Sequence, residues 1–593
     1  MRTRRTLRHL LWLIPFAFFL ACFIWLLQLR LPQIGGDYPM FIRYLLEGRW
    51  HVAHYGIAPL RYAVHLCGGM PMYGHPNELS YSLLQALALW MDPWNAVQVI
   101  LVLTLAAGYA GWYRLGRDVL KVGVPWSHVL ALVVQAHGFY LMHVIEGHMN
   151  FFQMPLIGWM LWLLLSPASR HMTLALRTAL FALLSASILH AGGYFTLLFF
   201  AMMTPALLPV LYVCRPTVSI PSLRELLLRS VALGGGALIL SCSKLVAVGS
   251  LMQAFPRTVP FGHFPSGINT FLAVLRSLWA LPQDTSFYTN MPWGSVENSM
   301  FLSPVVLVGT MLALFFLLQP AKKGALWRQA FLIVYCAILL EICLELAQGF
   351  GPSMLLLERF PLFTAIRVMT RFLYPFSLLL TMAAVAALHR FFAHSPRYDR
   401  QAAATALAVT ALCFPLAHLR IVEKLHLPAS LENMRITIHR MERSDFTQMP
   451  VAEVMKGNTD FQGKTGLVCL GDALFSWADQ PQSRILQVGP TTTVRDGYFN
   501  LMNPACYAYP EANNCTPGDR IASDDRENFE AFRTGQPLTW KMSRTQWLAD
   551  GLSLLGFLLL SGTAVWHAVS AWIPKVHRRR KAGTAKPRRR SRS

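Results

Sequence analysis

Residues 10–29 read LLWLIPFAFFLACFIWLLQL, a stretch without one charged side chain. A helix needs about 20 apolar residues to cross the roughly 30 Å of hydrocarbon in a bilayer. Because a backbone in lipid must satisfy its own hydrogen bonds, we expect this stretch to be a membrane-spanning helix. It is too long for the core of a signal peptide and no small-residue cleavage site follows it, so we expect the helix to be retained.

Comparable apolar stretches recur along the whole chain of 593 residues. Hydrophobic residues make up 54% of it and charged residues only 14%, whereas about a quarter of a typical soluble protein is charged. This pattern predicts an all-α polytopic membrane protein with about twelve transmembrane helices. The expected spans are residues 10–29, 95–113, 127–145, 150–166, 173–190, 193–213, 229–250, 300–318, 329–348, 371–389, 402–420 and 547–569.

Positive charges are distributed asymmetrically between the predicted loops. Four arginines precede the first span, and ten lysines and arginines follow Pro574 in the C-terminal tail. Alternate short loops carry further basic residues, and the positive-inside rule places all of them in the cytoplasm together with both termini. We expect the net charge of +23 to set topology and to contact anionic membrane lipids, and we expect no nucleic-acid binding.

This topology divides the chain into four parts. Residues 1–420 are expected to form a membrane domain of eleven helices with a long first outer loop at 31–94, and residues 547–569 the last helix. Residues 570–593 form a basic cytoplasmic tail. Residues 421–546 alternate short apolar runs with polar turns, which predicts a small α/β or mainly β domain on the outer face.

Two cysteines of that outer domain are close in sequence. Cys506 and Cys515 bracket the turn-prone segment Tyr507-Ala508-Tyr509-Pro510. If the outer compartment is the periplasm it is oxidising. We therefore predict a disulfide between Cys506 and Cys515.

The first outer loop carries the sharpest local pattern. It begins Gly35-Gly36-Asp37-Tyr38-Pro39, and the mixed apolar and polar residues 40–66 that follow are typical of helices lying on a membrane surface. A turn-rich stretch containing Glu78 comes next. Three other segments are expected on the same side: Glu146-Gly147-His148-Met149-Asn150, Trp293-Gly294-Ser295-Val296-Glu297-Asn298 and Ile366-Arg367-Val368-Met369-Thr370-Arg371.

An acidic residue just outside the first helix, followed by surface helices and these outer segments, resembles the GT-C superfamily of membrane glycosyltransferases. YfhO-like bacterial membrane proteins share this architecture. The resemblance implies a GT-C-like fold in a bacterial inner membrane. It implies transfer of a sugar from a polyprenyl-phosphate donor to an envelope glycan, lipid or protein acceptor on the periplasmic face. No metal ligands are assigned, and a divalent metal, Mg²⁺ or Mn²⁺, stays open as a cofactor.

The residue types suit this chemistry. Asp37 is the expected catalytic base, because glycosyl transfer needs a group that takes the proton of the acceptor hydroxyl. Arg367 and Arg371 are expected at the donor phosphate, since arginine forks match phosphate geometry and residues four apart share one face of a helix. The further site candidates are Glu78, Glu146, His148 and Glu297.

Structural roles for charged residues are the alternative interpretation. Arg367 and Arg371 could instead pair with Glu341 and Glu345 near the outer end of the ninth predicted span. Lys244 lies inside a predicted span, where it needs an ion-pair partner, a shifted protonation state or water. His137, His143 and His148 are spaced too unevenly to share one helix face, so no zinc site is expected.

Two other classes of function fit the same topology. One is a secondary transporter or lipid flippase, and the other is a non-catalytic subunit of an envelope-polysaccharide assembly system. The sequence contains no nucleotide-phosphate loop, which argues against an ATP-driven pump.

Overall fold

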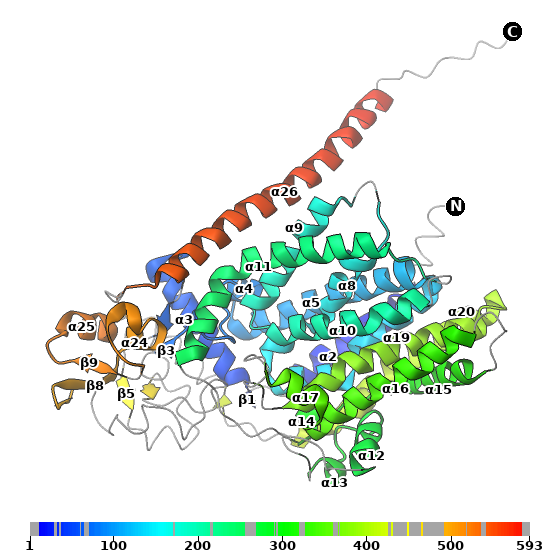
Figure 1. Cartoon of the computed structure of the whole chain (residues 1–593), viewed down its shortest axis with the longest axis horizontal. Coiled ribbons are helices and arrows are strands. Elements are labelled where there is room, and N and C mark those ends of the chain that lie inside the picture. The colour runs from blue at the N-terminus through cyan, green and yellow to red at the C-terminus, as the bar shows by residue number, and fades with distance from the viewer. Residues whose placement is uncertain are drawn as a thin grey trace.

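The computed structural model describes residues 11–28, 33–34, 37–59, 61–63, 70–169, 172–213, 218–254, 268–289, 291, 294–319, 326–359, 366, 368–424, 429–430, 447–449, 464–466, 492–517, 519–534, 536 and 541–583. They form an elongated bundle of helices with a small α/β unit at one end (Figure 1). The helices are α2 (Ile14–Gln28), α3 (Tyr38–Tyr55), α4 (Leu83–Ala88), α5 (Pro93–Leu115), η1 (Gly116–Leu120), α6 (Gly123–Gln135), α7 (Gly138–Glu146), η2 (Met149–Phe151), η3 (Met154–Leu156), α8 (Ile157–Leu165), α9 (Leu174–His190), α10 (Tyr194–Val213), α11 (Leu223–Ala254), α12 (Ile268–Ser277), α13 (Thr285–Tyr288), α14 (Gly294–Asn298), α15 (Pro304–Leu318), α16 (Leu326–Gln348), α17 (Pro352–Leu357), η5 (Met369–Phe372), α19 (Leu373–Phe392), α20 (Pro396–Lys424), α24 (Pro504–Ala508), η8 (Glu511–Asn513), α25 (Arg526–Thr534) and α26 (Arg544–Gly583).

The apolar helices support the prediction of a helical membrane protein. Within the described part of the chain, 7 helices are long and apolar enough to cross a membrane, and a bent pair makes an eighth. Every predicted span lies on a helix, but the expected number of twelve full-length spans is not reached. The reason is that four of the apolar helices have only 10–17 residues: Ile14–Leu27, Met149–Leu165, Leu174–His190 and Pro304–Leu318.

The predicted third span, residues 127–145, is a broken helix. The axes of α6 and α7 differ by 43° across the break. His137 caps α7, since its Nδ1 accepts from the Phe139 backbone N–H at 3.2 Å. The Gly138 N–H donates to the Phe301 carbonyl at 2.8 Å, and a Cβ on Gly138 would lie 2.6 Å from Phe301 Cβ. The segment before α15 therefore fills the break and satisfies the freed backbone.

Close packing of α5 against α8 depends on two glycines. A Cβ on Gly111 would lie 2.7 Å from the Trp159 backbone nitrogen, and one on Gly158 would lie 2.7 Å from that of Trp112. Small residues at these positions let the two backbones approach, as is common between membrane helices. Any larger side chain would push α5 and α8 apart.

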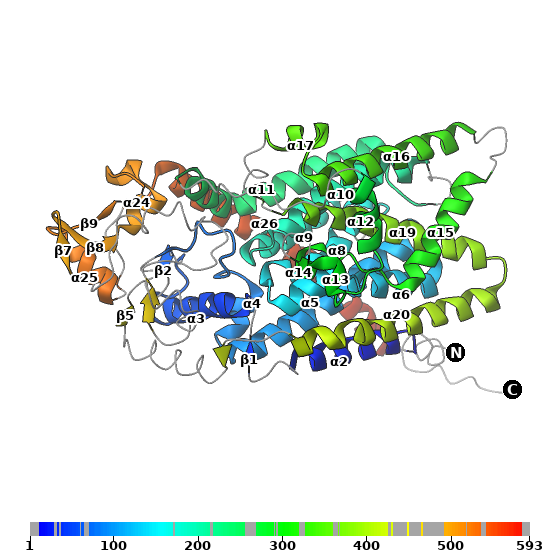
Figure 2. The ribbon, with the colours of Figure 1, turned by 90° about the horizontal axis from the view of Figure 1, so that it is seen from below.

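Several connections between helices lie at the end of the bundle away from the α/β unit (Figure 2). The Val119 carbonyl accepts from the Ser219 N–H at 2.9 Å, which joins η1 to the segment before α11. Trp126 Nε1 donates to Asp399 Oδ1 at 2.6 Å, which joins α6 to α20. The α5–α6, α10–α11 and α19–α20 connections are therefore neighbours, as alternate loops of a membrane bundle must be.

The small unit at the other end is built on a three-stranded antiparallel sheet in the order β7-β8-β9, with β7 Val494–Arg495, β8 Tyr498–Met502 and β9 Arg520–Ala522. Phe499 of β8 stacks on Phe529 of α25 with 3.8 Å between ring centroids, and both rings pack with Tyr62 from the segment between α2 and α5. The expected disulfide is confirmed, since Cys506 and Cys515 are bonded. This sheet agrees with the prediction of a small domain containing β structure.

Three two-stranded pairings complete the described strands. β1 (Gln33–Ile34) pairs with β4 (Ala429–Ser430), and β2 (Tyr62–Ala63) pairs with β3 (Met70–Pro71), both antiparallel. β5 (Thr447–Met449) pairs with β6 (Lys464–Gly466) in parallel. The β1–β4 pairing joins the exit of the first helix to the chain that follows α20.

The last helix, α26, is 40 residues long and contains the predicted span 547–569. It begins beside the α/β unit, packs along α11 and α9, and runs past the bundle (Figure 1). Only 6% of the apolar stretch of α26 is buried within the protein. A helix of this kind presents most of its surface to lipid.

Candidate functional site

Asp37 lies at the start of α3, and the end of α7 fixes its backbone. The Asp37 N–H donates to the Glu146 carbonyl at 2.8 Å, and the Tyr38 hydroxyl donates to the Val144 carbonyl at 2.5 Å. Gly147 has φ of +91° at the end of α7, and a Cβ there would lie 2.5 Å from the Tyr38 nitrogen. Only glycine permits both this turn and this approach. The segment between α2 and α5 is therefore attached to the end of α7 at Asp37, the predicted catalytic base.

The Asp37 carboxylate binds His148, another predicted site residue. His148 Nε2 lies 3.1 Å from Asp37 Oδ2, and the carboxylate is 47% exposed whereas the imidazole is only 13% exposed. Burial alone would lower the pKa of His148, but its hydrogen bond to Asp37 and the charges of Asp37 and Glu297 raise the pKa above its ordinary value. The other ring nitrogen, Nδ1, is buried without a hydrogen-bond partner in the described part of the chain.

Beside this pair, Arg371 holds Glu297. Arg371 Nε donates to Glu297 Oε2 at 2.7 Å, and its terminal nitrogen donates to Oε1. His143 Nε2 lies 3.1 Å from the same Oε2. Burial alone would raise the pKa of Glu297, but Arg371 and His143 hold that pKa well below its ordinary value. Glu297 is therefore a carboxylate with two buried partners.

Two aromatic rings orient the Arg371 guanidinium. Its central carbon lies 5.2 Å from the ring centroid of Phe151 and 4.8 Å from that of Phe195. Aromatic faces attract a cation, so the rings leave only the edges of the guanidinium for polar partners. Glu297 occupies one of these edges.

The structure thus brings together Asp37, His148, Glu297 and Arg371 from four predicted segments. Glu146 contributes its backbone carbonyl. Sequence reasoning missed the role of His143, which lies on an otherwise apolar helix. Its ring centroid is 4.9 Å from that of His148, although their spacing argued against a common helix face, because α7 ends between them.

Two predictions about arginines have different outcomes. Arg367 lies outside the described residues. Arg371 pairs with Glu297 and not with Glu341 or Glu345, and the second of these accepts from the Ser353 N–H at 2.7 Å. Val368 is extended and the helical turn that holds Arg371 begins at Met369, whereas the expectation that Arg367 and Arg371 share a helix face needs Arg367 and stays a prediction.

A metal ion fits this cluster poorly. His143, His148 and Glu297 offer ligand atoms within 4.8 Å of one another. However, Arg371 already binds both oxygens of Glu297, so a divalent cation would meet a positive charge where it needs a carboxylate. These residues therefore form an ion-pair cluster, and the reaction proposed below uses no metal ion.

Glu78, a further predicted site residue, belongs to a different cluster. Its Oε2 accepts from Lys244 Nζ at 2.8 Å, and both side chains are completely buried. The same ammonium donates to the carbonyls of Tyr73 and His75, each at 2.9 Å. All three donors of Lys244 are therefore used. Lys244 therefore has the ion-pair partner that a lysine inside a predicted span requires, and Glu78 attaches the segment between α2 and α5 to α11.

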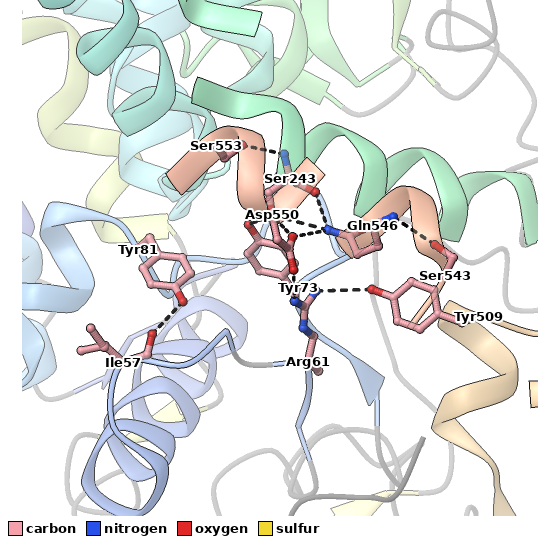
Figure 3. Close-up of polar contacts among 10 residues, drawn as sticks. All are labelled: Ile57, Arg61, Tyr73, Tyr81, Ser243, Tyr509, Ser543, Gln546, Asp550 and Ser553. Carbon is pink, nitrogen blue, oxygen red and sulfur yellow. Dashed lines mark hydrogen bonds and ion pairs between the residues drawn. The ribbon is translucent and has the colours of Figure 1, made fainter. Parts of the chain in front are cut away.

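Next to Lys244, a polar network joins the segment between α2 and α5 to α11, α26 and the α/β unit (Figure 3). Ser243 Oγ donates to Asp550 Oδ1 at 2.6 Å and bonds the Tyr73 hydroxyl at 2.7 Å. Arg61 donates to Asp550 Oδ2 at 2.5 Å and to the Tyr509 hydroxyl at 3.3 Å. We call this set the Arg61–Asp550 network.

No family model, curated protein or solved structure matches the chain.

Proposed function

We propose that the chain is a membrane glycosyltransferase that transfers a sugar from a polyprenyl-phosphate donor to an envelope glycan, lipid or protein acceptor. In this proposal the fold is GT-C-like, and all twelve apolar helical segments lie in a bacterial inner membrane. Both termini are cytoplasmic, and the Asp37 cluster and the α/β unit face the periplasm.

The observation that carries the proposal is the arrangement at Asp37. A half-exposed carboxylate is held by a buried imidazole, in the same cluster as a buried arginine. The acceptor hydroxyl would lose its proton to Asp37, and its oxygen would form the bond to the anomeric carbon. The bond from that carbon to the donor phosphate oxygen would break, and the lipid phosphate would leave with the electron pair. A base and a cation in the same cluster suit this displacement.

The surroundings of Asp37 also supply groups for a bound donor. Phosphate oxygens need cationic or N–H partners when they leave water. Arg371 provides a fixed guanidinium, and the Nδ1 of His148 is a buried polar atom with no partner among the described residues. Buried polar atoms are usually satisfied, so a ligand oxygen is a suitable partner for this one.

The test is product formation by purified Asp37→Asn protein with a polyprenyl-phosphate sugar. The amide keeps size and hydrogen bonding but is not a base, so turnover should fall by about 10²–10⁴. Donor affinity serves as the control and should stay close to wild type, and the melting temperature establishes that the variant is folded. Near-normal turnover would remove Asp37 from the reaction.

One observation favours a second candidate, a transporter or lipid flippase. The α6–α7 span is broken and bent by 43°, and broken helices form the binding sites of many secondary transporters. Reconstituted vesicles separate the two. A transporter moves a lipid phosphate or solute across the bilayer without forming a glycosidic bond, whereas the transferase forms product with no net movement.

A further inference from the structure

Glu297 is shared between two cationic partners at one of its oxygens. Arg371 Nε at 2.7 Å and His143 Nε2 at 3.1 Å both contact Oε2. The carboxylate lies on the edge of the Arg371 guanidinium, formed by Nε and a terminal nitrogen, that would donate hydrogen bonds to a phosphate. A phosphate can use that edge only after Glu297 has left it.

The hydrogen bonds of His143 show its protonation in this arrangement. Its Nδ1 lies 2.8 Å from the Phe139 carbonyl, which can only accept, so Nδ1 carries a proton. Its Nε2 faces a carboxylate that is already bound by an arginine, and this contact is a hydrogen bond only if Nε2 also carries a proton. His143 is therefore an imidazolium whenever both contacts are hydrogen bonds.

The charge balance of the cluster follows from this. When His143 and His148 are both protonated, these two histidines and Arg371 supply three positive charges, and Glu297 and Asp37 supply two negative ones. Buried charges are stable only when compensated. The cluster can accept one more negative charge, because Glu297 remains paired with His143 if Arg371 binds another anion in its place.

We infer that Glu297 binds Arg371 in the empty protein as an internal substitute for phosphate. When a phosphate ester binds Arg371, it displaces Glu297, which then pairs with His143 alone. The inference rests on the proposed phosphate role of Arg371. Glu297 keeps the arginine oriented and its charge compensated while the site is empty. His143 keeps Glu297 compensated once the site is filled. Both are positioning residues, since each acts through Arg371.

A double-mutant cycle on the full-length protein in detergent tests this, with farnesyl phosphate and inorganic phosphate as calorimetric probes. Glu297→Gln removes the competing charge and should tighten phosphate binding roughly tenfold, the worth of one charged hydrogen bond. His143→Gln leaves Glu297 with Arg371 alone and should weaken binding by about the same factor. In the Glu297→Gln background, His143→Gln should change little, because there is no carboxylate left to hold.

Two further variants make the cycle decisive. Glu225→Gln removes a carboxylate that pairs with another arginine, Arg229, and should bind like wild type. Glu297→Asp keeps the charge but shortens the arm, so it should also bind phosphate more tightly than wild type, and it serves if Glu297→Gln does not fold. Melting temperatures establish that each variant is folded.

The outcomes separate this inference from the proposed function. If Glu297→Gln and His143→Gln each weakened phosphate binding, and the double variant showed the sum of both losses, the exchange would be overturned and the proposed donor site would not. A wild-type protein that binds neither probe would overturn both. Tighter binding of farnesyl phosphate than of inorganic phosphate supports a lipid-linked ligand. Equal affinity together with the expected cycle would support the exchange and overturn the lipid-linked donor.

Discussion

His148 Nε2 and Asp37 Oδ2 lie 3.1 Å apart, so a largely buried imidazole holds the half-exposed carboxylate at the start of α3. This contact joins the end of α7 to the segment between α2 and α5. Because Asp37 and Glu297 together raise the pKa of His148, the strength of the contact must depend on pH.

The sign of that dependence follows from the direction of the shift. A histidine whose pKa is higher in the folded state stabilises the fold fully below its unfolded pKa of about 6.5. The contribution is lost as pH rises through the higher folded value. Wild type should therefore exceed Asp37→Asn in melting temperature by more at about pH 6 than at about pH 9. A difference that is constant with pH would show that His148 stays neutral, and Glu225→Gln is the control for charge removal elsewhere.

Much of the fold could be predicted from composition, because membrane helices are specified by local apolar runs. Each predicted span lies on a helix, and the α/β unit has its sheet and disulfide. Span length was harder to predict. The break at His137 and the short helix Pro304–Leu318 depend on the Phe301 segment that fills the gap, which is a tertiary contact.

The candidate site was predictable only in part. Asp37, His148, Glu297 and Arg371 could be proposed together because topology places their segments at one end of the bundle. Their pairing could not be predicted, because the partner of a buried charge depends on which side chains the fold places beside it. Glu78 pairs with Lys244 for this reason, and His143 gave no signal within an apolar helix.

The Lys244–Glu78 pair yields a stability prediction. Both side chains are 0% exposed, and removing one partner of a buried pair typically costs about 3–5 kcal/mol because the other charge is left alone. Glu78→Gln and Lys244→Met should each lower the melting temperature sharply. The double variant should recover most of the loss, although the Tyr73 and His75 carbonyls would still lack their donor. Thermal unfolding in detergent measures this, and additive losses would contradict an ionic role.

The Cys506–Cys515 disulfide closes a short loop in the α/β unit. By loop entropy it should stabilise that unit by about 2–3 kcal/mol. Replacing both cysteines by serine should lower the denaturant midpoint of the unit and leave the helical bundle unaffected. Mass spectrometry of non-reduced peptides from envelope-purified protein checks the bond. Two free thiols in that sample would show that it does not form in the cell.

The Arg61–Asp550 network yields the last prediction, which concerns how α26 and the α/β unit are held. Asp550 Oδ1 accepts from Ser243 Oγ at 2.6 Å and from Gln546 Nε2 at 2.7 Å, while Oδ2 accepts from Arg61 (Figure 3). Little else of α26 is buried, so these polar contacts should contribute a large part of the docking at its N-terminal end. Arg61 also reaches Tyr509, which connects the same carboxylate to the α/β unit.

Asp550→Asn removes the charge and turns an N–H₂ group toward Arg61 or Ser243, where an acceptor is needed. We expect amide hydrogen exchange to accelerate in α24 and β8 and at the start of α26, with a further increase in Asp550→Ala. Hydrogen exchange measured by mass spectrometry reports each segment separately. Thr563→Ala is the matched control, because Thr563 lies on the same helix. Among the described contacts, its hydroxyl donates only to the Leu559 backbone carbonyl of that helix. If Asp550→Asn and Thr563→Ala exchange alike in α24, the network does not hold the unit, and the apolar contacts of Tyr62 with Phe499 and Phe529 must do so.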